Sequence, residues 1–153
     1  MSRVHASADG DFPPATFVDA LTDFGPSRSQ IWGNSSNGHL IMHDRGDTWA
    51  DVTEGTDAGG IWQRYRYDWA DQHLVRLTVT DSNAFGVGSY WEYRLTPLEG
   101  GARTRMDLTI NRNPTTAKGK RFDLLLRLIG GLYFSRDLRR SVRRIEQLSP
   151  ASD

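Results

Sequence analysis

The central part of the chain, residues 39–112, alternates apolar and polar residues with a period of two. The segment 61–69 shows the pattern most clearly, because its odd positions are mostly large and apolar and its even positions are mostly charged. Successive side chains of a β-strand point to opposite sides, so this pattern predicts a strand with one buried and one solvated face. The expected buried face carries Ile61, Gln63, Tyr65, Tyr67 and Trp69.

Other segments of this region fit the same period and are joined by short turns such as Arg45-Gly46-Asp47 and Glu99-Gly100-Gly101. Consecutive half-buried strands with short connections are typical of an antiparallel meander. A further short strand is expected at 3–8. The sequence therefore predicts a six- or seven-stranded antiparallel sheet with one large apolar face. The other expected strands are 39–44, 48–54, 74–80, 88–98 and 102–112.

Two short helices are expected between the first strand and the meander. Proline is tolerated in a first helical turn, so Pro13-Pro14 can begin a helix that continues over 15–23. Gly25-Pro26 ends it, and 27–32 is expected to form a second short helix.

After Pro114 the apolar residues recur with a period near 3.6, which predicts a long C-terminal helix. Its first half, with a run of large residues over 122–134, is apolar on nearly all sides, and its second half is apolar on one side. Each glycine of the pair Gly130-Gly131 lowers helix stability by about 1 kcal/mol relative to alanine. Their presence in the middle of the helix therefore indicates a bend or a close approach to backbone or ligand. The expected buried stripe is Leu124, Leu128, Leu138, Val142 and Ile145.

These elements predict one α+β domain over 1–153, in which the sheet wraps around the C-terminal helix. A helix is about 10 Å across and cannot cover a wide sheet unless the sheet curls around it. Curling leaves a space, so a cavity is expected beside the first half of the helix.

The order of elements and several segments carry a resemblance to known proteins. The segments are 17–23 (FVDALTD), 46–55 (GDTWADVTEG), 67–69 (YDW), 78–83 (TVTDSN), 88–93 (GSYWEY) and the helix from Lys118. Over nearly its whole length the chain resembles the START-like superfamily, also called SRPBCC, which includes polyketide cyclase-like and pollen-allergen-like proteins. The resemblance implies a helix-grip fold with a deep, mostly apolar cavity. Such proteins range from lipid and hormone carriers to aromatase/cyclases, so the fold does not choose among these functions.

Composition and charge exclude several classes. The chain has 19 basic and 19 acidic residues, so no net charge draws it to nucleic acid. Residues 115–153 are net positive and the rest net negative, which favours complementary surfaces within one fold over a polyanion site. There is no cysteine, so disulfides and thiolate chemistry are excluded. The run 122–134 holds Asp123 and Arg127 and is shorter than the roughly 20 residues of a membrane span. No secretion signal is recognisable at the N-terminus, so we expect a soluble, cytoplasmic protein without integral membrane contact.

No metal, cofactor or catalytic nucleophile is expected. The two closest histidines on one predicted strand face, His39 and His43, would be about 13 Å apart, too far to share a metal ion. No Gly-x-Ser-x-Gly motif is present. The arginines of the last helix, from Arg136 to Arg144, are expected on its solvated face.

The candidate ligand-binding residues are the large side chains of the expected inner sheet face and of the front of the helix. Gln63 is the amide on that face, and a ligand contact and a structural hydrogen bond are equally compatible with it. The candidates are Gln63, Tyr65, Tyr67, Trp69, Leu77, Trp91, Tyr93, Met106, Leu108, Phe122, Leu125, Leu126, Ile129 and Tyr133.

Three functions are compatible with these features. The first is a non-catalytic domain that binds or carries a small hydrophobic ligand such as a lipid, isoprenoid or aromatic polyketide. The second is an aromatase/cyclase-like enzyme without cofactor, in which Gln63, Tyr65, Tyr67 or Arg112 would assist proton transfer. The third is a membrane-surface or partner-binding role for the apolar front of the helix. A homodimer also remains open.

Overall fold

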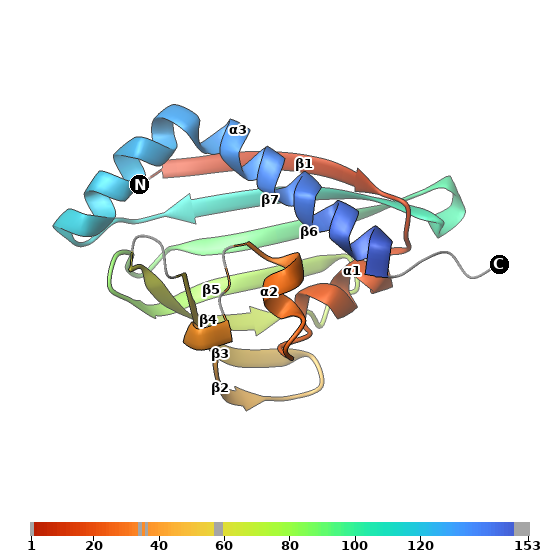
Figure 1. Ribbon diagram of the computed structural model, residues 1–153, viewed down its shortest axis with the longest axis horizontal. Helices are drawn as coiled ribbons and strands as arrows, with labels where there is room; N and C mark the ends of the chain where they lie inside the picture. The colour runs from red at the N-terminus through yellow and green to blue at the C-terminus, as the bar shows by residue number, and fades with distance from the viewer. Residues whose placement is uncertain (1, 34, 36, 57–59, 149–153) are drawn as a thin grey trace.

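The computed structural model describes residues 2–33, 35, 37–56 and 60–148. Seven antiparallel strands form a sheet in the order β1-β7-β6-β5-β4-β3-β2, and three helices lie against one face of it (Figure 1). The predicted α+β class, with two short helices after the first strand and a long C-terminal helix, is confirmed. The strands are β1 (Ser2–Gly10), β2 (Ile41–Arg45), β3 (Trp49–Gly55), β4 (Trp62–Asp68), β5 (Leu74–Ser82), β6 (Tyr90–Leu98) and β7 (Arg103–Arg112). The helices are α1 (Pro14–Leu21), α2 (Arg28–Ile31) and α3 (Ala117–Leu148), with 3-10 turns at Asn37–His39 and Glu99–Gly101.

The inner face of the sheet forms the core, as the period of two predicted. One row of residues crosses five strands in register, and its members face the helices. Rows of this kind stabilise a sheet because directly opposed side chains pack against each other. The row consists of Ala50, Tyr67, Leu77, Trp91 and Ile110.

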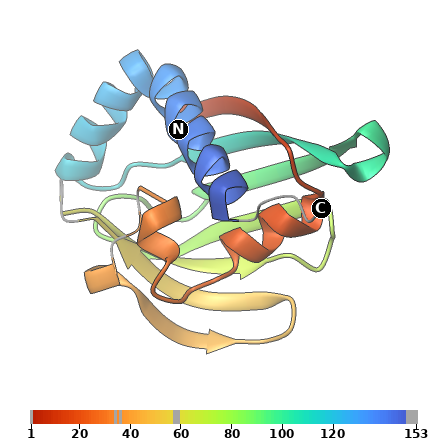
Figure 2. The same ribbon diagram turned by 45° about the vertical axis from the view of Figure 1, so that its right-hand side comes forward.

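The helix α3 crosses the β1 side of the sheet and bends near its middle, where Gly130-Gly131 falls (Figure 2). Its rear half, 133–148, buries Leu138, Val142 and Ile145. Ser141 fastens this half to α2, because its hydroxyl donates a hydrogen bond of 2.9 Å to the carbonyl oxygen of Ile31.

The front half of α3, 117–132, corrects the predicted stripe. Leu124 and Leu128 are 62% and 79% exposed, and the residues that face the sheet are Gly119, Asp123, Leu126 and Gly130. Hydropathy does not score glycine and aspartate as core residues, so the pattern of leucines gave the wrong face.

The glycines explain why this half is seated on its less apolar side. A Cβ on Gly119 would collide with the carbonyl oxygen of Ala84, and a Cβ on Gly130 would lie 3.2 Å from Cγ2 of Val4. Of the two alternatives predicted from Gly130-Gly131, the bend is present near the middle of α3, and Gly130 packs closely on the side chain of Val4 and not on backbone. Across the described ranges, no helix is both long enough and apolar enough to cross a bilayer.

Candidate functional site

A cavity of about 330 Å³ lies between the inner face of the sheet and the helices α2 and α3. Its walls come from β3 to β6, from the end of α1, from α2 and from the front and middle of α3. The lining residues are Leu21, Arg28, Trp32, Gly33, Glu54, Gly55, Thr56, Ile61, Gln63, Tyr65, Tyr67, Leu77, Phe85, Trp91, Tyr93, Phe122, Tyr133 and Phe134.

Aromatic rings make up much of the wall and pack edge to face. The rings of Trp91 and Phe134 are 5.4 Å apart at 89°, which joins the sheet to α3. The rings of Tyr65 and Tyr67 are 6.0 Å apart at 85°. Contacts of this geometry stabilise aromatic pairs and hold the rings in fixed orientations. The wall is therefore rigid and largely apolar.

A buried polar cluster interrupts this wall. Arg28 of α2 donates from Nε to Oε1 of Glu54 at 2.7 Å and from Nη2 to the Tyr67 hydroxyl at 2.7 Å. The Tyr67 hydroxyl in turn donates to Oε2 of Glu54. The side chains of Arg28 and Glu54 are only 2% and 8% exposed. A buried ion pair is tolerated when its remaining donors and acceptors are also satisfied.

The surrounding backbone satisfies the rest of the cluster. Nη1 of Arg28 donates to the carbonyl oxygens of Leu21 and Asp23, at 2.7 and 3.0 Å. Ser35 donates to Oε1 of Glu54 at 2.9 Å. The guanidinium also lies 4.6 Å from the centre of the Phe24 ring. These contacts tie the end of α1 and the start of α2 to β3 and β4, so the cluster holds one wall of the cavity in place.

Burial sets the protonation of the cluster. It raises the pKa of Tyr67 well above its usual value, and the attraction of Arg28 offsets this only in part. Burial alone would lower the pKa of Arg28. Its interactions with Tyr67 and Glu54 raise this pKa by more than burial lowers it, so the guanidinium stays charged. At neutral pH the cavity thus presents a protonated phenol beside a fixed cation.

Gln63 lies on the same wall, opposite Glu54 in the β3–β4 pair. Burial raises the pKa of Tyr65 well above its usual value, and the neighbouring Gln63 side chain opposes this shift. The Gln63 side chain also lines the cavity. A ligand contact by Gln63 stays a prediction.

A smaller hollow of about 40 Å³ adjoins the cavity and shares Gln63, Trp91 and Phe122 with it. Arg112 closes it and donates from Nε to Oδ1 of Asp123 at 3.0 Å. Arg112 is 4% exposed, and within the described part of the chain its Nη1 has no hydrogen-bond acceptor. Arg112, one of the groups considered for proton transfer, thus lies in an ion pair beside the main cavity.

The structure brings eight of the fourteen predicted ligand-binding residues together at the cavity. These are Gln63, Tyr65, Tyr67, Leu77, Trp91, Tyr93, Phe122 and Tyr133. The other six lie outside the main cavity. Met106 and Leu108 are core residues of β7, and Trp69 packs at the edge of the core. Leu126 lines the small hollow, and Leu125 and Ile129 are exposed on α3. Contact of any of these side chains with a ligand stays a prediction.

Sequence reasoning missed Arg28 and Glu54. Glu54 continues the phase of Ala50 and Val52, which are completely buried, so a carboxylate stood on the inner face of a predicted strand. Arg28 stands three residues before Ile31 and four before Trp32, which places it on the apolar side of a short helix. Each charge in an apolar phase was a signal that it is buried and needs a partner, but the pairing of the two charges came only from the structure.

Comparison with solved structures finds the same architecture in proteins of low sequence identity. The aromatase/cyclase ZhuI from Streptomyces sp. R1128 superposes with a TM-score of 0.76 at 16% identity, over 98% of this chain and 96% of that one. A START superfamily protein from Mycobacterium smegmatis gives 0.71 at 11% identity, over 95% and 98% of the two chains. The di-domain ARO/CYC StfQ from the steffimycin biosynthetic pathway gives 0.60 at 15% identity, over 94% of this chain and 43% of that one.

Comparisons with models of protein families and with curated protein sequences find no match. The structural likeness confirms the predicted helix-grip fold and the resemblance to START-like structures. At these identities the likeness establishes the fold, and any function must be argued from the cavity itself.

Proposed function

We propose that this protein binds a small, mostly apolar molecule that carries one polar group. The observation that supports this proposal is the cavity of about 330 Å³ with aromatic walls and the buried polar cluster Arg28–Glu54–Tyr67 on its surface. The volume is at the lower end of ligand sites, which span about 300–1,000 Å³, so a compact ligand fits best. Aromatic walls favour a flat molecule, and the polar group would meet the phenol and guanidinium.

The first test is native mass spectrometry of the purified full chain, followed by denaturation and mass analysis of whatever was retained. We expect a small molecule bound in one copy per cavity, with at least one oxygen or nitrogen atom. A retained hydrocarbon without a polar atom would contradict the role of the polar cluster.

The second test uses N-phenyl-1-naphthylamine as a neutral aromatic probe and compares two tryptophan substitutions one residue apart. Leu77 lines the cavity, while its neighbour Thr78 is exposed on the opposite side of β5. Leu77→Trp fills the cavity and should weaken probe binding by at least about tenfold, since a blocked site loses its apolar contacts. Thr78→Trp should leave binding unchanged. Equal affinity in both variants, with circular dichroism showing both folded, would overturn the proposed site.

The convergence of polar groups on the wall favours a second candidate, an aromatase/cyclase-like enzyme, the activity named for two of the structurally similar proteins. The phenol of Tyr67 is protonated at neutral pH and donates to Oε2 of Glu54; to act as an acid it would turn this proton toward a carbonyl oxygen that gains charge, with the Arg28 cation beside it. Cyclisation of a flexible chain also benefits from confinement in a shaped cavity.

A linear poly-β-ketone thioester, analysed by liquid chromatography and mass spectrometry, tests this second candidate. Turnover would give cyclised, dehydrated products absent from buffer, and Tyr67→Phe would lower kcat by about 10²-fold while probe binding persists. A product distribution identical to that in buffer would exclude this activity on the substrate and leave the binding proposal intact.

A further inference from the structure

The front half of α3 exposes a continuous row of apolar side chains. Five of them, 46% to 79% exposed, form what we call the apolar ridge: Leu124, Leu125, Leu128, Ile129 and Leu132. Single exposed leucines are common, but a contiguous group of this kind marks a binding surface.

Helix geometry makes the ridge one surface. Leu124, Leu128 and Leu132 are four residues apart and stack along one line, while Leu125 and Ile129 form an adjacent line. Positions that face the sheet, such as Leu126, lie on the opposite side of α3. The ridge therefore points away from the body of the protein.

Positive charge surrounds the ridge. Arg121 precedes it by about one turn and Lys118 by nearly two, while Arg136 and Arg139 follow it; all four are exposed. Two acidic residues lie between Lys118 and Arg139: Asp123 is buried in ion pairs with Arg112 and Arg127, and Asp137 is half-buried beside Gly33. The surface thus has an apolar centre with cations at both ends.

We infer that this face of α3 lies on an anionic lipid bilayer, with the apolar ridge among the acyl chains and the flanking cations against lipid phosphates. Amphipathic helices with this arrangement bind in the plane of the interface through buried apolar area and electrostatic attraction. The inference rests on the exposed ridge and does not depend on the ligand proposed for the cavity.

The cavity and the ridge share one part of α3. Phe122 and Tyr133 line the cavity and are also 37% and 50% exposed. They stand just before and just after the ridge in the sequence. Docking of the ridge would therefore bring one wall of the cavity to the lipid surface.

A second copy of this chain fits the ridge less well than lipid does. A two-fold interface would place each ridge against its own equivalent. The flanking cations of the two copies would then approach each other, and like charges in a partly desolvated contact are unfavourable. An anionic lipid surface attracts the same cations. The charges around the ridge therefore favour lipid over a second copy of the chain.

Vesicle flotation of the full chain tests the inference. We expect binding to phosphatidylcholine vesicles that contain phosphatidylglycerol, weaker binding to pure phosphatidylcholine, and loss of the difference at high salt. Leu128→Glu/Leu132→Glu should lower the partition coefficient at least about tenfold. Arg121→Gln/Arg139→Gln should remove part of the salt-dependent binding.

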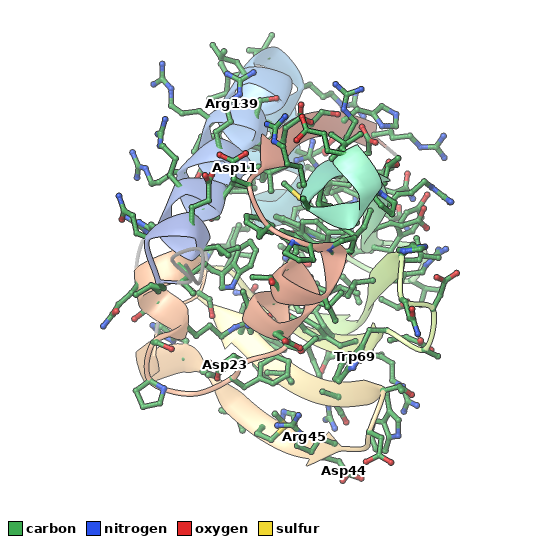
Figure 3. The ribbon with its side chains drawn as sticks, turned by 90° about the vertical axis from the view of Figure 1, so that its right-hand side faces the viewer. Asp11, Asp23, Asp44, Arg45, Trp69 and Arg139 are labelled. Carbon is green, nitrogen blue, oxygen red and sulfur yellow. The ribbon has the colours of Figure 1, made fainter. Side chains whose placement is uncertain are left out.

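The matched control is Ile41→Glu/Met42→Glu, which adds the same two charges at exposed apolar residues of β2, the edge strand opposite to β1. Figure 3 shows Arg139 of α3 and Arg45 of β2 at opposite ends of the molecule. This control should bind vesicles as the wild type does.

Three results would overturn the inference: no binding to anionic vesicles, equal loss in the control, or wild-type binding by Leu128→Glu/Leu132→Glu. Size-exclusion chromatography tests the alternative that a second copy of this chain covers the ridge. A dimer that this variant turns into monomer, without vesicle binding by the wild type, would show the ridge to be an interface between copies. Retained binding of N-phenyl-1-naphthylamine by the variant would show that the fold and the cavity are intact.

Discussion

The two halves of α3 are held to the sheet by different forces. The rear half buries Leu138, Val142 and Ile145 and follows its apolar stripe. The front half turns Leu124, Leu125, Leu128 and Leu132 outward and is seated through Gly119, Leu126, Gly130 and the ion pair of Asp123 with Arg112. Apolar content therefore corresponds to burial in one half of the helix and to an exposed apolar surface in the other.

The strongest test of this difference removes the ion pair. Asp123→Ala should lower the free energy of unfolding by about 3–5 kcal/mol, because it leaves Arg112 buried without its carboxylate. Urea unfolding measures the change. Arg112→Met/Asp123→Leu removes both charges and should restore most of the stability. A loss below about 1 kcal/mol in Asp123→Ala would mean that this pair does not hold the front half.

The same leucine substitution in each half gives the next largest contrast. Leu138→Ala should cost about 2–5 kcal/mol, because it opens a cavity in the core. Leu128→Ala, at an exposed position, should change the stability by no more than about 0.5 kcal/mol. Urea unfolding of both variants provides the comparison, and similar losses would show that the front leucines are packed in solution.

Replacing a glycine near the bend by alanine should change the stability less than the leucine substitution in the core, and should increase it. A Cβ on Gly131 meets no atom within 4 Å, so Gly131→Ala should stabilise the protein by about 1 kcal/mol through helix propensity. Gly130→Ala should gain less, because its Cβ would lie 3.2 Å from Val4. Thermal unfolding of the two variants would decide this, and a larger gain at Gly130 would contradict the close approach.

The smallest expected effect concerns Asp137 in the rear half. Burial raises the pKa of Asp137, and Arg140 and Arg144 oppose this in part. A raised pKa in the folded state means that stability is lost as the pH rises from the unfolded pKa, about 3.9, through the folded pKa. Asp137→Asn should therefore stabilise the protein at neutral pH, by under about 1 kcal/mol because the site is partly solvated.

The pH dependence of the comparison between wild type and Asp137→Asn provides its control. The stability difference between wild type and Asp137→Asn should vanish in acid, below the unfolded pKa, where the carboxyl is protonated in both states. A difference that does not change with pH would trace the effect to packing and not to charge.

Most strands could be predicted because side-chain alternation follows from the pleat of a strand and needs no knowledge of its neighbours. In β4 the predicted inner residues Tyr65 and Tyr67 are buried and Arg66 is exposed. The polar cluster could not be predicted in the same way. Arg28 and Glu54 are 26 residues apart in the sequence, and their contact depends on where α2 packs against β3.

By itself, the sequence determined the period of each element, the order of the elements and the large aromatic side chains of the inner sheet face. These follow from backbone geometry and hydrophobic burial, which act locally along the chain. Only the tertiary structure decided which side of the front of α3 meets the sheet. Gly119 allows close contact with the backbone of Ala84, Gly130 allows close packing on the side chain of Val4, and Asp123 pairs with a buried cation; all three depend on partners distant in the sequence. For the same reason, the fold decided that the leucines of the ridge face outward.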